Sequence, residues 1–173
     1  MTEVTQETGS LRKLADMTIT EAPVAKTEML IRRPVHEVFR AFIDPAITTR
    51  FWFTKSSGRL EEGKRVRWDW EMYGVHSDVE VKEIEQNKRI LIEWSSHAGR
   101  TQVEWVFSAR PDNTTFVTIT NQGFHGNGDE IVKQALDSTL GFTLVLSGLK
   151  AFLEHGIALN LVADKRPDAH VTH

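Results

Sequence analysis

One long helix is predicted by residues 131–156, which read IVKQALDSTLGFTLVLSGLKAFLEHG. Its apolar residues recur at steps of three, four and seven, which is the period of a helix with one apolar face: Ala135, Phe142, Leu146, Leu149 and Leu153. Acidic residues at 129–130 suit the helix start, and Gly156 is typical of a C-terminal stop. An apolar face of this length needs a partner, and the preceding residues supply one.

That partner is a series of predicted strands. Apolar and polar side chains alternate over residues 66–70, 75–85, 89–94, 101–110 and 114–120. Adjacent strands without intervening helices indicate an antiparallel meander with one face toward the interior. Upstream, residues 24–31 predict a first strand, and VHEVFRAF (35–42) and PAITTRFWF (45–53) predict two short helices. The order predicts an α+β fold.

Length and composition limit the organisation and the function. The chain has 173 residues and fits one domain, which we expect over residues 24–164, with a polar extension at 1–23 and a tail at 165–173. A net charge of -3 removes the overall electrostatic argument for nucleic acid. With no cysteine, thiolate metal sites and disulfides are excluded. No apolar run approaches a membrane span and no secretory signal pattern opens the chain, so a cytoplasmic location is expected.

Tryptophan placement is the most informative feature for function. Five tryptophans stand against one tyrosine, and four of them alternate with polar residues on predicted strands. Such rings either fill a core or line a pocket for an apolar ligand, because rigid rings leave gaps that aliphatic side chains would fill. The predicted ligand-binding residues are Trp52, Trp68, Trp70, Ser77, Trp94, Trp105, Phe107, Asn121, Phe124, Phe142 and Leu146.

Polar residues near these rings have two interpretations. A buried indole N–H needs an acceptor, and Ser77, Asn121, Thr118 or Thr120 can supply one or can orient a ligand. None of the seven histidines has a metal-ligand spacing, so neither a metal nor a cofactor is predicted. His125, in the loop sequence FHGNG, is a weak catalytic candidate; its loop either gates the mouth of the pocket or simply connects two elements.

Several segments resemble a known family: IRRPVHEVFRAFIDPAITTRFW, the glycine-bounded turn before RWDW, VKEIEQNKRILIEW, TTFVTITNQGF and GFTLVLSGLKAFLEHG. They span residues 26–156 and resemble the activator of heat-shock-protein-ninety ATPase homologue branch of the SRPBCC superfamily, with START, pollen-allergen-like and polyketide cyclase proteins. The resemblance implies a helix-grip fold, in which a bent antiparallel sheet wraps a long helix and leaves a cavity. Asn121 replaces a histidine usual in the family, and Phe142 stands where relatives often carry tryptophan.

Three functions remain open at this stage. The first is binding of a hydrophobic or aromatic small molecule, or a lipid-like ligand, between sheet and helix. The second is a cyclase or aromatase type of enzyme in which His125, Asn121 or Asp78 moves protons. The third, suggested by the family name, is a co-chaperone that stimulates a chaperone ATPase. The sequence does not define the oligomeric state.

Overall fold

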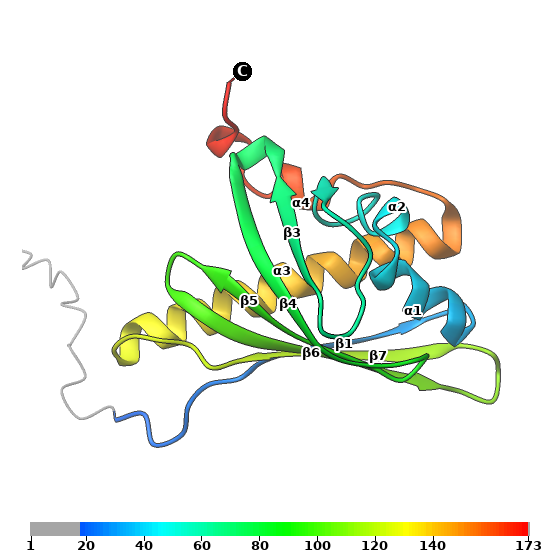
Figure 1. The fold of residues 1–173 in the computed structure, drawn as a ribbon, viewed down its shortest axis with the longest axis horizontal. Helices are drawn as coiled ribbons and strands as arrows, with labels where there is room; N and C mark the ends of the chain where they lie inside the picture. The colour runs from blue at the N-terminus through cyan, green and yellow to red at the C-terminus, as the bar shows by residue number, and fades with distance from the viewer. Residues whose placement is uncertain (1–17, 173) are drawn as a thin grey trace, which may run out of the picture.

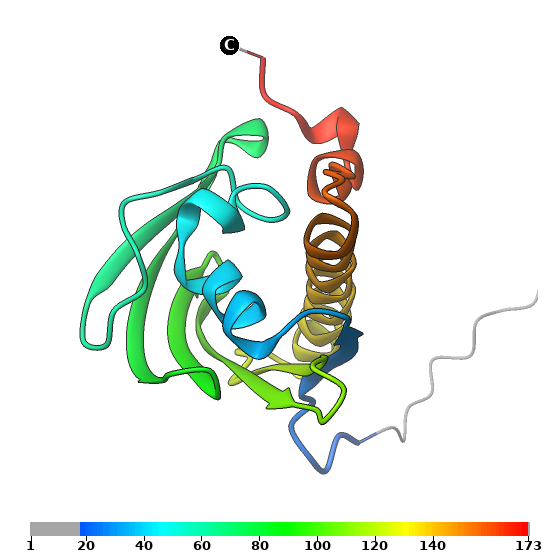
Figure 2. The ribbon, with the colours of Figure 1, turned by 90° about the vertical axis from the view of Figure 1, so that its right-hand side faces the viewer.

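The computed structural model describes residues 18–172 and shows a seven-stranded antiparallel sheet curved around one long helix (Figures 1 and 2). The elements in chain order are β1 Ala25–Ile31, α1 Val35–Ile43, α2 Pro45–Thr48, β2 Lys55–Ser56, β3 Arg65–Trp70, the 3-10 turn η1 Glu71–Tyr73, β4 Val75–Glu85, β5 Arg89–Ser96, β6 Gly99–Ala109, β7 Thr115–Gln122, α3 Gly128–His155, α4 Leu161–Asp164 and the 3-10 turn η2 Pro167–Ala169. The α+β class and the helix-grip arrangement predicted above are confirmed. The predicted extension falls largely on residues 1–17, which lie outside the described residues.

The strand order is β1-β7-β6-β5-β4-β3-β2, and every neighbouring pair is antiparallel. The chain crosses from one edge of the sheet to the other through α1 and α2, returns strand by strand, and closes with β7 beside β1. The predicted meander is therefore confirmed. A change of register between Val81 and Glu83 on β4 marks a β-bulge, a feature that bends a strand and increases its twist.

Two predictions about local structure were only partly right. Residues 45–53 do not form one helical segment, because α2 ends at Thr48 and a turn carries Phe51 and Trp52. The alternation predicted over residues 75–85 puts Val75 on the buried face of β4, but Val75 is exposed at the strand end, next to the left-handed Gly74. The burial alternation begins at Ser77, where β4 is flanked by neighbouring strands.

α3 begins at a capping box. The Asn127 side chain accepts a hydrogen bond from the Glu130 backbone N–H at 3.0 Å, and the Glu130 carboxylate accepts one from the Asn127 N–H at 2.8 Å. This reciprocal pair satisfies two N–H groups that the helix cannot use. The helix ends at Gly156, whose φ of 66° favours glycine.

One face of α3 covers the sheet and the α2–β2 connection. Its buried residues are Ala135, Phe142, Val145, Leu146, Gly148 and Leu149. Gly148 allows a close approach, since a Cβ there would lie 3.3 Å from the backbone oxygen of Phe51. α3 is long and apolar enough to cross a membrane by length and composition, a property it shares with core helices of soluble proteins.

The segment after α3 folds back onto the turn between β3 and β4. The Tyr73 hydroxyl lies 2.5 Å from the carbonyl oxygen of Val162 and 3.1 Å from that of Ala163. The Val171 N–H donates to the Met72 carbonyl at 2.9 Å. These contacts fix the C-terminal segment, residues 157–171, to η1 (Figure 1).

Substitutions at two glycines of α3 should change the stability of the protein in opposite directions. Gly141→Ala should raise the free energy of unfolding by about 1 kcal/mol, because nothing lies within 4 Å of the new methyl group and alanine favours a helix. Gly148→Val should lower it by roughly 1–3 kcal/mol through contact with Phe51. Urea unfolding measures both. An equal response at the two positions would contradict the close approach.

Removing the Tyr73 hydroxyl should weaken the attachment of the C-terminal segment to η1. Tyr73→Phe should speed amide exchange at Val171 and reduce stability by about 1 kcal/mol, since the one hydroxyl proton that lies between the Val162 and Ala163 carbonyl groups is lost. Hydrogen exchange measures the change, with amides of the β6–β7 ladder as the internal control. Unchanged exchange at Val171 would show that the segment is held by other contacts.

Candidate ligand-binding site

Eight aromatic rings meet between the sheet and α3. This aromatic cluster consists of Phe42, Trp52, Phe53, Trp68, Trp70, Trp94, Trp105 and Phe142. The strands contribute Trp68, Trp94 and Trp105 because alternate residues of a strand point to the same face. Trp70, at the end of β3, is the fourth strand tryptophan, and of the four Trp94 and Trp105 contact Phe142 of α3, at 5.7 and 6.1 Å between ring centroids.

Trp52 lies at the centre of the aromatic cluster. Its ring centroid is 4.9 Å from that of Trp68, 5.7 Å from Phe142, and 6.0 Å from both Trp94 and Trp105. Most pairs are tilted or edge-to-face, the geometries that the ring quadrupole favours. Trp52 is carried by the connection after α2, and its backbone N–H donates to the Thr48 carbonyl at 3.0 Å and not to a neighbouring strand.

Three other predicted site residues lie around the aromatic cluster. Phe107 packs against Phe39 and Phe42 beneath α1, at ring distances of 5.4 and 5.9 Å. Leu146 is fully buried on α3, one turn from Phe142. Phe124 is half-buried in the loop before α3 and makes no ring contact within residues 18–172. The structure thus places Phe107 and Leu146 with the core and Phe124 outside the aromatic cluster.

A polar network enters the apolar wall beside Trp94. The Asn121 side chain, 2% exposed, donates through Nδ2 to Thr101 Oγ1 at 2.9 Å and to the Gln102 carbonyl at 2.8 Å. Trp94 Nε1 also donates to Thr101 Oγ1, at 2.8 Å, and Ser138 Oγ on α3 donates to Asn121 Oδ1 at 2.8 Å. Asn121 therefore joins β6, β7 and α3 in one buried hydrogen-bonded unit.

The expected acceptors for the indole N–H groups were partly wrong. Thr118 and Thr120 lie on the outward face of β7: Thr118 contacts Glu28, and Thr120 lines a hollow on that face. Ser77 points inward, but its hydroxyl donates to the Ser95 carbonyl at 2.6 Å. The observed acceptor is Thr101, which sequence reasoning missed although its alternation with Val103 and Trp105 marks it as inward-facing.

His125 does not join the aromatic cluster. Its ring lies against Gly99 of the β5–β6 hairpin, and Nε2 is 2.8 Å from the Arg100 carbonyl oxygen. Gln134 on α3 donates to the His125 carbonyl at 2.7 Å. The exposed loop therefore links the hairpin to α3, and gating by this loop stays a prediction. Asp78, the carboxylate of the enzyme hypothesis, is exposed on β4.

Several charged groups with shifted pKa values lie on the outward face of the sheet. A hydrogen bond from Lys82 lowers the pKa of the Glu80 carboxyl, with Arg65 and Arg100 adding to the effect. A hydrogen bond to Glu104 raises the pKa of the Arg89 guanidinium. Within residues 18–172 no group of three histidine, aspartate or glutamate side chains is arranged to hold a metal ion.

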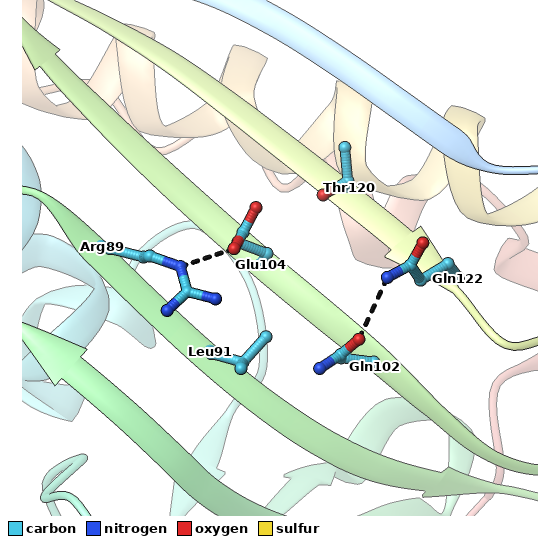
Figure 3. Close-up of a pocket in the computed structure, with 6 residues that line it drawn as sticks. All are labelled: Arg89, Leu91, Gln102, Glu104, Thr120 and Gln122. Atoms are coloured by element: carbon cyan, nitrogen blue, oxygen red, sulfur yellow. Dashed lines mark hydrogen bonds and ion pairs between the residues drawn. The ribbon is translucent and has the colours of Figure 1, made fainter.

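Two hollows lie away from the rings. One, of about 120 Å³, is lined by Arg89, Leu91, Gln102, Glu104, Thr120 and Gln122 on the outward face (Figure 3). Its floor is closed by pairs across the strands, Arg89 with Glu104 and Gln102 with Gln122. A second hollow, of about 440 Å³, lies beside Arg65, Asp78 and Glu80. Neither is lined by a member of the aromatic cluster.

The curved sheet, the long C-terminal helix and the ring-filled interior define a helix-grip protein of the SRPBCC superfamily. The family model described as Activator of Hsp90 ATPase homolog 1-like protein matches residues 32–154. The chain belongs to this family, as the resemblance in its sequence predicted. The C-terminal segment lies beyond the matched residues.

Solved structures agree with this assignment. The crystal structure of SSP2350 from Staphylococcus saprophyticus is 31% identical in sequence, with a TM-score of 0.68 and coverage of 79% of this chain and 96% of that chain. DynU16, described as a putative protein in the dynemicin biosynthetic locus, is 23% identical, with a TM-score of 0.68 over 78% of this chain and 48% of DynU16. CalU16 from Micromonospora echinospora is 17% identical, with a TM-score of 0.64 over 84% and 83%. The last two share the fold. No curated protein sequence matches the chain significantly.

The stability of the protein should depend strongly on the Asn121 side chain, because it joins the polar network. Asn121→Ala should lower the free energy of unfolding by roughly 2–3 kcal/mol, because the Gln102 carbonyl and the Ser138 hydroxyl lose buried partners. Chemical denaturation measures it. The control is Gln122→Ala, the next residue, whose side chain is exposed and whose loss should change stability by no more than about 0.5 kcal/mol. Equal losses of stability in the two variants would show that the network around Asn121 does not stabilise the fold.

Proposed function

We propose that the protein binds an apolar aromatic small molecule among the rings between the sheet and α3. The observation that carries the proposal is the position of Trp52, whose ring is surrounded by seven others from three strands, two helices and its own connection. Aromatic side chains with a few placed polar groups are the usual lining of small-molecule sites. A ligand ring enters by displacing Trp52, which is not held in a strand ladder.

The family and the neighbours support this class of function. Membership of the family agrees with small-molecule binding or a chaperone interaction. The name of DynU16 connects a protein of the same fold with a biosynthetic locus. Among the three hypotheses, binding uses the aromatic cluster itself. Of the three residues of the enzyme hypothesis, His125 and Asp78 are exposed, and the buried Asn121 amide is already hydrogen-bonded to Thr101, Gln102 and Ser138. The co-chaperone hypothesis draws on the family description.

A larger side chain on α3 that fills the proposed binding site tests the proposal. With the unaltered protein, indane should raise the thermal midpoint in a concentration-dependent way. Phe142→Trp places a larger ring where the ligand would lie, and it should weaken indane binding at least tenfold, measured by equilibrium dialysis. A protein with a solid interior would bind neither indane nor its ketone, 1-indanone, at any concentration, and that result would refute the proposal.

The matched control makes the same substitution elsewhere on α3. Phe152→Trp changes a ring that packs under the Arg50 guanidinium, 5.4 Å from its centroid, outside the aromatic cluster. Indane affinity should stay within about twofold of the unaltered protein. Equal loss of affinity in both variants would place the binding site outside the aromatic cluster.

A further inference from the structure

Trp105 has a buried donor without a partner. Its side chain is 1% exposed, and within residues 18–172 no acceptor lies within hydrogen-bond distance of Nε1. The surrounding rings are Phe42, Trp52 and Phe142, at 5.7, 6.0 and 6.1 Å between centroids. An indole nitrogen is a donor only, so this N–H needs an acceptor from outside the protein or loses its hydrogen bond. Leaving such a group unpaired costs about 1–3 kcal/mol.

Thr101 offers a second donor on the same face of β6. Its Oγ1 accepts from Trp94 Nε1 and from Asn121 Nδ2. The orientation of the Asn121 amide is fixed, because the same Nδ2 faces the Gln102 carbonyl oxygen at 2.8 Å. Both lone pairs of the hydroxyl are therefore in use, and its own proton has no acceptor among the described residues. Thr101 and Trp105 are four residues apart on one strand, roughly 13 Å along it.

We infer that the ligand of the aromatic cluster carries a hydrogen-bond acceptor, a ring-conjugated ketone or quinone oxygen, that binds Trp105 Nε1. The inference rests on the proposed function and narrows it from apolar aromatics to aryl ketones. The inward face of β6 has two hydrogen-bond donors without an acceptor in the described part of the chain, Trp105 Nε1 and the Thr101 hydroxyl. A ketone oxygen of the ligand can accept from such a donor, whereas a hydrocarbon ligand cannot. A second acceptor on a longer ligand would meet the Thr101 hydroxyl.

A pair of probes of the same shape tests this complementarity. Indane and 1-indanone differ by one ketone oxygen, and their dissociation constants are measured by equilibrium dialysis with each protein. The quantity compared is the ketone preference, the ratio of the indane constant to the 1-indanone constant. Comparing ratios between proteins cancels the different cost of removing each probe from water.

The diagnostic variant is Trp105→Phe, which removes the N–H and keeps an aromatic ring. The ketone preference should fall about fivefold, the change expected for one net hydrogen bond. The control is Trp94→Phe, since the Trp94 N–H already donates to Thr101. That variant should retain the wild-type ketone preference within about twofold, whatever its affinity for both probes.

A measurement on the unaltered protein guards against a variant that fails to fold. The Trp105 indole N–H signal in a proton–nitrogen NMR spectrum, assigned through its strand neighbours Ile90 and Ile119, should move downfield with 1-indanone and not with indane.

The outcomes separate the two proposals. Binding of both probes with no loss of ketone preference in Trp105→Phe, or with no movement of the Trp105 signal, overturns the acceptor inference and leaves the proposed function standing. No binding of either probe to the unaltered protein overturns both.

Discussion

Water has to be excluded from a sheet face that carries four tryptophan rings, and α3 excludes it together with α1 and the α2–β2 connection. Phe142, Leu146 and Leu149 form the apolar stripe that faces the strands. The capping box at Asn127 fixes where this helix begins, and Gly148 lets it approach the α2–β2 connection. Burial of large aromatic surface is the largest favourable contribution that a domain of this size has available. The position of Trp52 at the centre of the rings follows from this packing.

The two faces of the sheet divide the chemistry of the protein. The outward face carries alternating charges that pair across strands, such as Lys82 with Glu93 and Arg89 with Glu104. Partly exposed pairs of this kind contribute little to stability, and they keep the outer face hydrated. The inward face has aromatic rings and one uncharged polar network around Asn121. The alternation of charged and apolar side chains along each strand therefore separates a solvated face from the aromatic interior in which we propose that the ligand binds.

The periodic parts of the structure could be predicted from the sequence, and the remainder depended on contacts between distant residues. Strand alternation gave β4 its bounds, and apolar spacing with Gly156 gave the end of α3. The capping box had a local signal, Asn127 followed three residues later by glutamate, which went unused. Alternation with Val103 and Trp105 marks Thr101 as inward-facing, but its pairing with Trp94 depends on the register between β5 and β6, which the sequence does not define. The left-handed Gly74 and the exposed strand end explain why Val75 left the predicted buried face.

The polar groups inside the protein are uncharged, and this affects whether the interior can bind a ligand or transfer a proton to it. An indole N–H, a threonine hydroxyl and an asparagine amide all form hydrogen bonds, and none of them ionises near neutral pH. The histidine and the carboxylate of the enzyme hypothesis, His125 and Asp78, lie on exposed parts of the structure. Fixed donors in an apolar wall hold a ligand oxygen in one orientation, because each unpaired donor penalises any other placement. The geometry of the aromatic cluster thus favours selection and orientation of a ligand over proton transfer to it.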